Sequence, residues 1–427
     1  MDSLIKNGYV FLPDGSYAKK DIAVKDGRIA AVGDIPDDFK AEETIDASDM
    51  FIVPGFVNAH THASMTLLRS YADDMMLQDW LTKKIWPTEA NMVSDDIYWG
   101  AALAAVEMIK GGTTCFADMY GPYMERVAEV VNQSGMRAVL SRGMIGINPN
   151  GEKALQENVS LFNDWNGAAD GRITVMFAPH APYTCPPDFL KKINSVAEKL
   201  GAEIHIHMSE TKQEVEDMQK QYGKRPFKLV EDTGIFERGA LAAHCVWLDE
   251  EDISIIRKHH IRVAHNPGSN MKLASGAAPI PRLLKDGVCV ALGTDGASSN
   301  NNLDMLEEVR LAALLHKTFL LDPLAVPAAE ALKMGTEYGS DAVGVKDSGR
   351  IEAGYKADLV MYSMNAAEWY PRNDLVSLLV YAANSSSVDT VMVDGKLIMQ
   401  KRHILTLDEE RIKYEANRCA MKLTGKA

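Results

Sequence analysis

The chain has 427 residues, of which 46% are hydrophobic and 24% are charged, a composition typical of globular proteins. This length suits one large α/β domain together with a smaller one. Lys and Arg total 45 against 59 Asp and Glu, so the net charge is −14, which argues against a nucleic-acid partner because phosphate binding needs a basic surface.

The five cysteines are odd in number and contain no Cys-x-x-Cys pair, which argues against a disulfide framework and against a thiolate zinc site. The first residues lack the apolar core of a signal peptide, and no apolar run reaches membrane-spanning length. We therefore expect a cytoplasmic protein without a membrane partner.

The first 50 residues alternate apolar and polar positions around two hairpin signals, Asp14-Gly15 and Asp26-Gly27. The same alternation returns only near the other end, around Asp394-Gly395. Because chain termini usually lie close together in space, the pattern predicts one discontinuous β-sandwich domain built from residues 1–55 and 348–405.

The middle of the chain repeats a helical pattern, a glycine stop and a short apolar strand. One unit begins with a helix from Ser94 to Lys110, which Gly111-Gly112 ends before the strand 113–118. Eight such strands are predicted, at residues 51–62, 113–118, 136–142, 172–180, 202–207, 240–244, 260–265 and 288–295. They predict a (β/α)8 TIM barrel over residues 56–347, with an open doubly wound sheet as the alternative. Residues 406–427 are expected to form a helix packed on the outside.

Ionisable side chains end most of these strands, and the carboxyl ends of barrel strands surround one mouth. They are His60, His62, Arg142, His180, His207, His244, His265 and Asp295. Each alone would be an ordinary core or rim residue, but their joint placement indicates a site. His205 faces inward one layer deeper, where we expect a packed, hydrogen-bonded histidine.

Three imidazoles and one carboxylate, from His60, His62, His207 and Asp295, suit one divalent metal ion. Zinc fits this set best, with iron or another divalent ion as alternatives. Such an ion makes a hydroxide nucleophile from bound water near neutral pH, and Asp295 would accept the proton. Glu210 follows His207 closely enough to carry a proton over the metal; it also suits the first turn of a helix.

Four sequence motifs resemble the amidohydrolase superfamily of metal-dependent hydrolases. They are Pro54-Gly-Phe-Val-Asn-Ala-His-Thr-His62, the His207-x-x-Glu210 pair, His244 and Gly293-Thr-Asp295-Gly. The strand that carries a bridging lysine in two-metal members has His180 here, which is similar to the one-metal branch. Further stretches resemble 5-methylthioadenosine/S-adenosylhomocysteine deaminases: residues 62–74, 77–81, 85–89, 178–185, 265–276 and 294–304.

The resemblance implies roles for individual residues. Glu210 would protonate a purine ring nitrogen, hydroxide would attack the amino-bearing carbon, and Asp295 would pass a proton to the departing ammonia. His244 would orient the nucleophile. The remaining substrate contacts would come from Glu89 and His180 at the ribose, Arg142 near the 5′ substituent, and Ser299.

One departure bears on the substrate. Some family members carry a second arginine just before a Leu-x-Glu-Asn segment, whereas Ala154 and Lys153 stand there in this chain. A lysine replaces the fork of an arginine only partly, so S-adenosylhomocysteine is hypothesised to be a poorer substrate than methylthioadenosine or adenosine.

Two other functions stay open at this point. A related amidohydrolase would act on another heterocycle, as guanine or pterin deaminases and triazine chlorohydrolases do. A barrel that had lost its metal would serve only as a binding protein. The expected partners are a small nucleoside and, from the base rate for large enzymes, further copies of the chain in a homo-oligomer.

Overall fold

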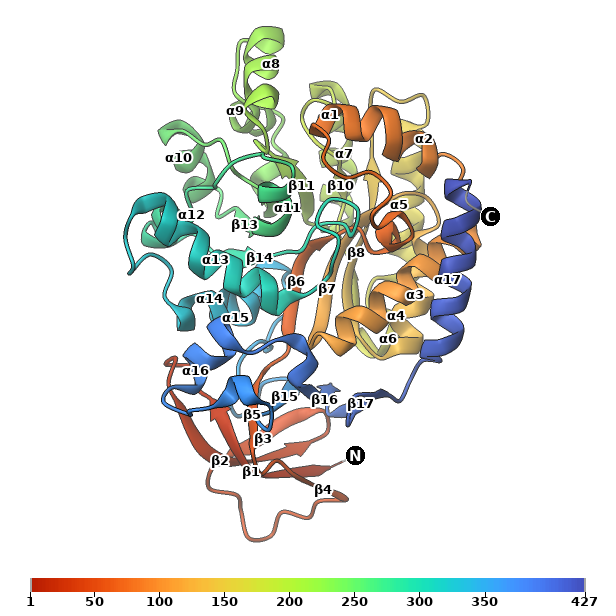
Figure 1. The fold of residues 1–427 in the computed structure, drawn as a ribbon. Coiled ribbons are helices and arrows are strands. Elements are labelled where there is room, and N and C mark those ends of the chain that lie inside the picture. The colour runs from red at the N-terminus through yellow and green to blue at the C-terminus, as the bar shows by residue number, and fades with distance from the viewer. Residues whose placement is uncertain (1, 426–427) are drawn as a thin grey trace.

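The computed structural model describes residues 2–425, and the predicted barrel forms its centre (Figure 1). The inner strands are parallel and almost entirely buried, as their continuous apolar sequences predict. They are β6 (Phe56–Thr61), β7 (Thr113–Tyr120), β8 (Arg137–Met144), β9 (Ile173–Val175), β10 (Ala178–Pro179), β11 (Ile204–Met208), β12 (Ala240–His244), β13 (Arg262–His265) and β14 (Val290–Leu292).

The strands form two arcs that meet at two seams. One arc has the order β10-β8-β7-β6 with β9 beside β8, and the other has the order β11-β12-β13-β14. A parallel bridge joins Phe177 to Ile204 at the first seam. At the second, the backbone N–H of Asp295 donates to the carbonyl of His60 at 2.9 Å. These seams close the (β/α)8 barrel and exclude the open doubly wound sheet.

Helices cover the outside of the barrel (Figure 1). The longest ones follow the predicted repeat, and α3 begins and ends at the predicted residues, Ser94 and Lys110. Its first turn is capped by Asp96, whose carboxylate accepts the N–H of Val93 at 3.0 Å. The other α-helices around the barrel are α1 (Leu77–Trp80), α2 (Trp86–Glu89), α4 (Met124–Ser134), α5 (Gly151–Trp165), α6 (Ala168–Gly171), α7 (Pro187–Leu200), α8 (Lys212–Tyr222), α9 (Pro226–Glu231), α10 (Glu250–Lys258), α11 (Pro267–Lys272), α12 (Ile280–Lys285), α13 (Met305–Leu320), α14 (Ala328–Gly335) and α15 (Glu337–Ala342).

The two ends of the chain share one nine-stranded sheet, in the order β18-β17-β16-β15-β5-β1-β2-β3 with β4 beside β1. Its strands are β1 (Ser3–Phe11), β2 (Tyr17–Lys25), β3 (Arg28–Val32), β4 (Glu43–Asp46), β5 (Met50–Pro54), β15 (Leu359–Ser363), β16 (Val388–Val393), β17 (Lys396–Gln400) and β18 (His403–Ile404). An antiparallel bridge from Arg28 to Lys356 curls the sheet back on itself. The two layers of the expected sandwich are therefore continuous, and they enclose a core that includes Ile22 and Leu359.

The predicted strand 51–62 is wrong in one respect, because the chain breaks it at Gly55. Residues before the break form β5 in the terminal sheet, and residues after it form β6 in the barrel. A side chain at Gly55 would overlap that of Thr114, so only glycine fits where the chain passes between the two parts. The domain division at residues 55 and 348 stays a prediction that this break supports.

Between β15 and β16 the chain is helical, where the sequence was interpreted as part of the β domain. Short turns at η4 (Ala367–Trp369), α16 (Leu375–Ser377), η5 (Leu378–Ala382) and η6 (Ser385–Ser387) lie against the barrel. Arg310 of α13 anchors them by donating from Nε to the carbonyl of Val380 at 2.9 Å.

The last helix, α17 (Glu409–Thr424), lies along α3 on the outside, and Lys110 pairs with Glu409 at 2.7 Å (Figure 1). Residues 426 and 427 of the expected outer segment, and residue 1 of the expected β domain, lie outside the described residues. Within residues 2–425, no helix has the length and the apolar character needed to cross a bilayer.

Candidate metal and substrate site

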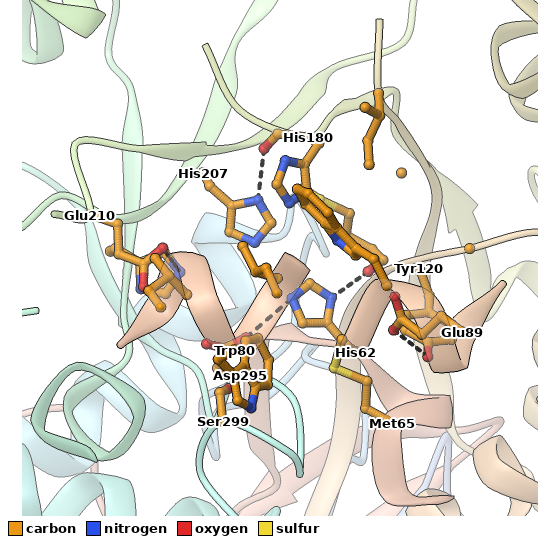
Figure 2. A pocket seen from close by; sticks show the side chains of 18 of the residues that line it. His62, Met65, Trp80, Glu89, Tyr120, His180, His207, Glu210, Asp295 and Ser299 are labelled. Carbon is orange, nitrogen blue, oxygen red and sulfur yellow. Dashed lines mark hydrogen bonds and ion pairs between the residues drawn. The ribbon is translucent and has the colours of Figure 1, made fainter. Parts of the chain in front are cut away.

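Three of the four predicted metal ligands are histidines that end two strands on opposite sides of the barrel mouth. His60 lies on β6, His62 follows directly after its last residue, and His207 lies on β11. One nitrogen from each of the three lies within 4.8 Å of the others, which is close enough for one ion to bind all three. Figure 2 shows His62 and His207 facing the same space above Asp295.

Each histidine is oriented through its Nδ1 atom. His62 hydrogen-bonds to the carbonyl of Met119, and His207 to the carbonyl of His180 at 2.7 Å. His60 hydrogen-bonds to Nε2 of His205 at 2.9 Å. Such contacts are the usual way in which proteins orient a metal-binding imidazole, and they leave Nε2 available.

The polar atoms that remain fit a metal ion. Among the described residues, Nε2 of His60 is fully buried and has no hydrogen-bond partner. Burial lowers the pKa of His60 to about 4 and the pKa of His207 well below its usual value, so both rings favour the neutral form that binds metal. Uncharged imidazoles with a spare buried nitrogen are what a zinc-type site requires.

Asp295 completes the set from the loop after β14. Its Oδ1 atom lies 3.1 Å from Nε2 of His62 and 3.5 Å from Nε2 of His60. The hydroxyl of Ser269 donates to Oδ2 at 2.7 Å, and the N–H of Gly296 donates to Oδ1 at 2.8 Å. Although burial acts to raise it, the pKa of Asp295 lies well below its usual value because both histidines face the carboxylate. Burial likewise acts to lower the pKa of His62, but the facing carboxylate raises it to about 9.

Glu210 lies just beyond the end of β11, beside this cluster (Figure 2). Its carboxyl is 3.8 Å from Nε2 of His244 and accepts a hydrogen bond from the hydroxyl of Ser275 at 3.3 Å. Burial raises its pKa, so the carboxyl keeps a proton more readily than a free glutamate does. Glu214 of α8 accepts the backbone N–H of Glu210 at 2.8 Å and so fixes the turn that presents it.

His244 ends β12 with a left-handed backbone, φ 73°. This conformation is costly for a residue other than glycine, about 1–3 kcal/mol, and such residues cluster at functional sites. Nδ1 of His244 meets Oδ1 of Asn270 at 2.9 Å, which leaves Nε2 pointing at Glu210.

A partly enclosed cavity opens above these residues. It brings together nearly all the predicted site residues; His60 lies buried beneath it. Those that line it are His62, Glu89, Arg142, His180, His207, Glu210, His244, Asp295 and Ser299.

Four aromatic residues of the cavity were missed as site residues. Trp80 and Trp86 come from the helical segment that follows β6, Tyr120 is the last residue of β7, and Tyr183 lies shortly after β10. Tyr120 donates to Glu89 at 2.7 Å, as Figure 2 shows. Tyr120 is the last residue of β7, which runs two residues further than the predicted strand 113–118. A search for polar residues at strand ends would have found it if that strand end had been predicted correctly.

The expectation that His265 faces the mouth is wrong. Its Nε2 atom lies 3.2 Å from Nε2 of His316 on α13, and His265 does not line the cavity. Successive side chains of a strand point to opposite faces of the sheet. The last residue of a barrel strand therefore points into the mouth or toward the outer helices, depending on where the strand ends.

Comparison with known proteins identifies the family of the chain. The amidohydrolase family model matches residues 51–398. The 5-methylthioadenosine/S-adenosylhomocysteine deaminase of Pelotomaculum thermopropionicum is 53% identical over 417 residues, which cover 97% of this chain and 96% of that protein.

Solved structures agree on the fold. An adenosine deaminase from Xanthomonas campestris with bound zinc superposes with a TM-score of 0.94 at 35% identity, covering 99% of both chains. A zinc complex of atrazine chlorohydrolase from Arthrobacter aurescens gives a TM-score of 0.91 over 98% of this chain and 100% of that one; its 23% identity supports the fold alone. The chain therefore belongs to the amidohydrolase family, among the 5-methylthioadenosine/S-adenosylhomocysteine deaminases.

Proposed function

We propose that the protein is a hydrolytic deaminase of adenine nucleosides, which converts 5-methylthioadenosine, S-adenosylhomocysteine or adenosine into the inosine derivative and ammonia. The observation that carries the proposal is the buried carboxyl of Glu210, with its raised pKa, beside His60, His62, His207 and the Asp295 carboxylate that faces two of these rings. A carboxyl that keeps its proton can donate it to a ring nitrogen, which deamination of a purine requires. The names of the related proteins point the same way.

His60, His62, His207 and Asp295 would hold one divalent ion. Zinc is the proposed ion, because it suits this donor set and the Xanthomonas structure contains it; Fe²⁺ is the alternative. When bound, such an ion lowers the pKa of a coordinated water toward neutrality and so supplies the nucleophile.

The protein's own groups handle the protons. Glu210 donates one to the purine ring nitrogen, which draws electrons from the amino-bearing carbon. Asp295 accepts one proton from the attacking water and delivers it to the amine, so that neutral ammonia leaves. The second proton of the water passes to the Glu210 carboxylate as the ring carbonyl forms, which restores the acid. His244, held by Asn270, orients the water between them.

The rest of the cavity would hold the nucleoside. Glu89 and His180 are placed to bind the ribose hydroxyls, with Ser299 as a further contact, and Trp80 and Trp86 add flat apolar surface. Tyr120 and Thr184 fix Glu89 and His180 by hydrogen bonds of 2.7 and 2.9 Å. The homo-oligomeric state and the cytoplasmic location stay predictions.

An ultraviolet deamination assay tests the proposal. The purified protein is incubated with adenosine, methylthioadenosine, S-adenosylhomocysteine, guanine and a chlorotriazine, with and without a chelator. We expect chelator-sensitive loss of the adenine absorbance for at least one adenine nucleoside. Turnover of only guanine or the chlorotriazine would reject the proposal in favour of another heterocycle.

A further inference from the structure

One outer helix of the barrel, α13, is apolar on its solvent side as well as on its inner side (Figure 1). It packs on the barrel through a buried stripe at helical spacing, which includes Val309 and Ala313. The opposite face of a surface helix is normally polar or charged. Residues 311–320 contain only one Lys, Arg, Asp or Glu, which is Lys317, and Leu314 on the outward face is exposed.

The apolar surface continues around the C-terminal end of α13 and into the next loop. Phe319, Leu320, Leu321 and Leu324 are each at least half exposed. Together with Leu314, these four residues are called the α13 patch. Five exposed side chains of this size leave several hundred Å² of apolar surface in water, the upper end of what a soluble single chain normally exposes. A patch of this size is typical of an interaction surface.

The backbone at Leu321 supports the same conclusion. Leu321 follows the last residue of α13 in the left-handed conformation, with φ 53°. Glycine is the usual residue at such a helix end, because a Cβ atom destabilises this conformation. The chain has a leucine there, and its side chain is 89% exposed. The single chain therefore carries the strain without burying the side chain, and a partner would supply that burial.

The loop after α13 is held in place by its own polar groups. The ammonium of Lys317 donates to the carbonyl of Ala325 at 2.6 Å and to the carbonyl of Val326 at 2.9 Å. The carboxylate of Asp322 accepts the N–H of Leu324 at 2.8 Å. Both charged groups nearest the patch thus bind within the loop. An apolar surface on an ordered backbone loses little conformational freedom on docking, which favours association.

A second copy of the chain fits this surface in charge and in area. The chain has a net charge of −14, so two copies repel one another wherever their acidic surfaces meet. The α13 patch contains no charged residue and is complementary to itself, as a contact across a two-fold axis requires. A stable interface buries about 800 Å² on each partner, a little over half of it apolar, and the patch supplies apolar surface of that order.

We propose that the α13 patch is the contact through which two copies of the chain form a two-fold dimer. The outward face of α13 in one copy packs against the same face in the other, and the loops that carry Leu321 and Leu324 flank this contact. The interface lies on the outside of the barrel, so the inference does not depend on the chemistry proposed for the mouth.

The variants Leu321→Glu and Leu324→Glu, made separately in the full chain, test this inference. Each places a carboxylate from both copies in the apolar contact, so the dissociation constant of the dimer should rise about 100-fold or more. Sedimentation equilibrium measures it. The native mass should be twice the 46.9 kDa of one chain, or four times if dimers associate further, and both variants should show half the native mass at micromolar concentration. Their circular dichroism spectra should match the native spectrum, because both side chains are exposed in the single chain.

Tyr414→Glu is the matched control. Tyr414 lies on α17 and is 69% exposed, so its substitution adds the same charge at an exposed apolar residue outside the patch. The control should keep the native mass. A native protein with the mass of one chain would overturn the inference, because no second copy would then cover the patch. A native mass kept by both leucine variants, or an equal loss of mass in the control, would also overturn it.

Discussion

At the scale of the residue, each candidate metal ligand uses one polar atom for a hydrogen bond to the protein and has another polar atom that faces the site. His62 and His207 use backbone carbonyls, His60 uses His205, and Asp295 uses Ser269. A held side chain loses little freedom when it binds a ligand, so the free energy of binding is larger. Binding of the proposed metal ion therefore depends also on residues that do not ligate it.

Glu210→Gln separates proton transfer from metal binding. The amide has nearly the same shape as the acid but cannot donate the required proton, so kcat should fall by about 10³-fold. Metal content, measured by atomic spectroscopy, should stay at the native level. Glu216→Gln, an exposed pair partner of Lys212 on α8, should keep full activity. Full activity of Glu210→Gln would show that another group carries the proton.

His205→Leu tests the orientation of His60. Without the contact to His205 the ring of His60 can rotate or change tautomer, and we expect metal affinity to fall about 10- to 100-fold. Titration against a competing chelator measures this. His265→Leu is the control, because His265 is equally buried but faces His316. Equal losses in the two variants would mean that core packing, not orientation, is responsible.

At the scale of the element, the site depends on how closely strands approach at the second seam. The end of β14 passes so near β6 that a Cβ atom at Gly293 would lie 2.8 Å from both the backbone N and the carbonyl O of His60. Glycine is thus required there for packing, and the same approach lets the N–H of Asp295 reach His60.

Gly293→Ala should force β6 and β14 apart. Overpacking of this kind costs about 1–3 kcal/mol, and it should also weaken metal binding because His60 moves relative to Asp295. Thermal unfolding and metal titration measure the two effects. Gly121→Ala, where a Cβ meets nothing within 4 Å, should leave the melting temperature unchanged. An unchanged melting temperature in Gly293→Ala would mean that the seam is pliable.

At the scale of the molecule, a buried ion cluster joins the barrel to the terminal sheet. Arg137 of β8 is 3% exposed and pairs with Asp358 at 3.1 Å and with Asp394 at 2.7 Å. The two carboxylates lie just before β15 and just after β16, so both belong to the C-terminal half of the sheet. The cluster ties the far end of the chain to the base of the barrel.

Arg137→Met should therefore destabilise the whole molecule. Removing one partner leaves Asp358 buried without its counter-charge, which costs about 3–5 kcal/mol. Denaturant unfolding measures the loss as a lower midpoint. Arg282→Met removes an exposed arginine that pairs with Asp286 and should change stability by less than about 1 kcal/mol. A loss as small as the control's would show that the two parts hold together through apolar packing alone.

The sequence by itself determined the repeating strand-helix pattern, the shared sheet of the two ends and the four candidate metal ligands, because these follow from local periodicity and from residues that end strands. The tertiary structure alone decided the break at Gly55, the outward turn of His265, the helical segment between β15 and β16, and the contact of His205 with His60. These depend on register and on neighbours distant in sequence, which one strand's pattern does not contain.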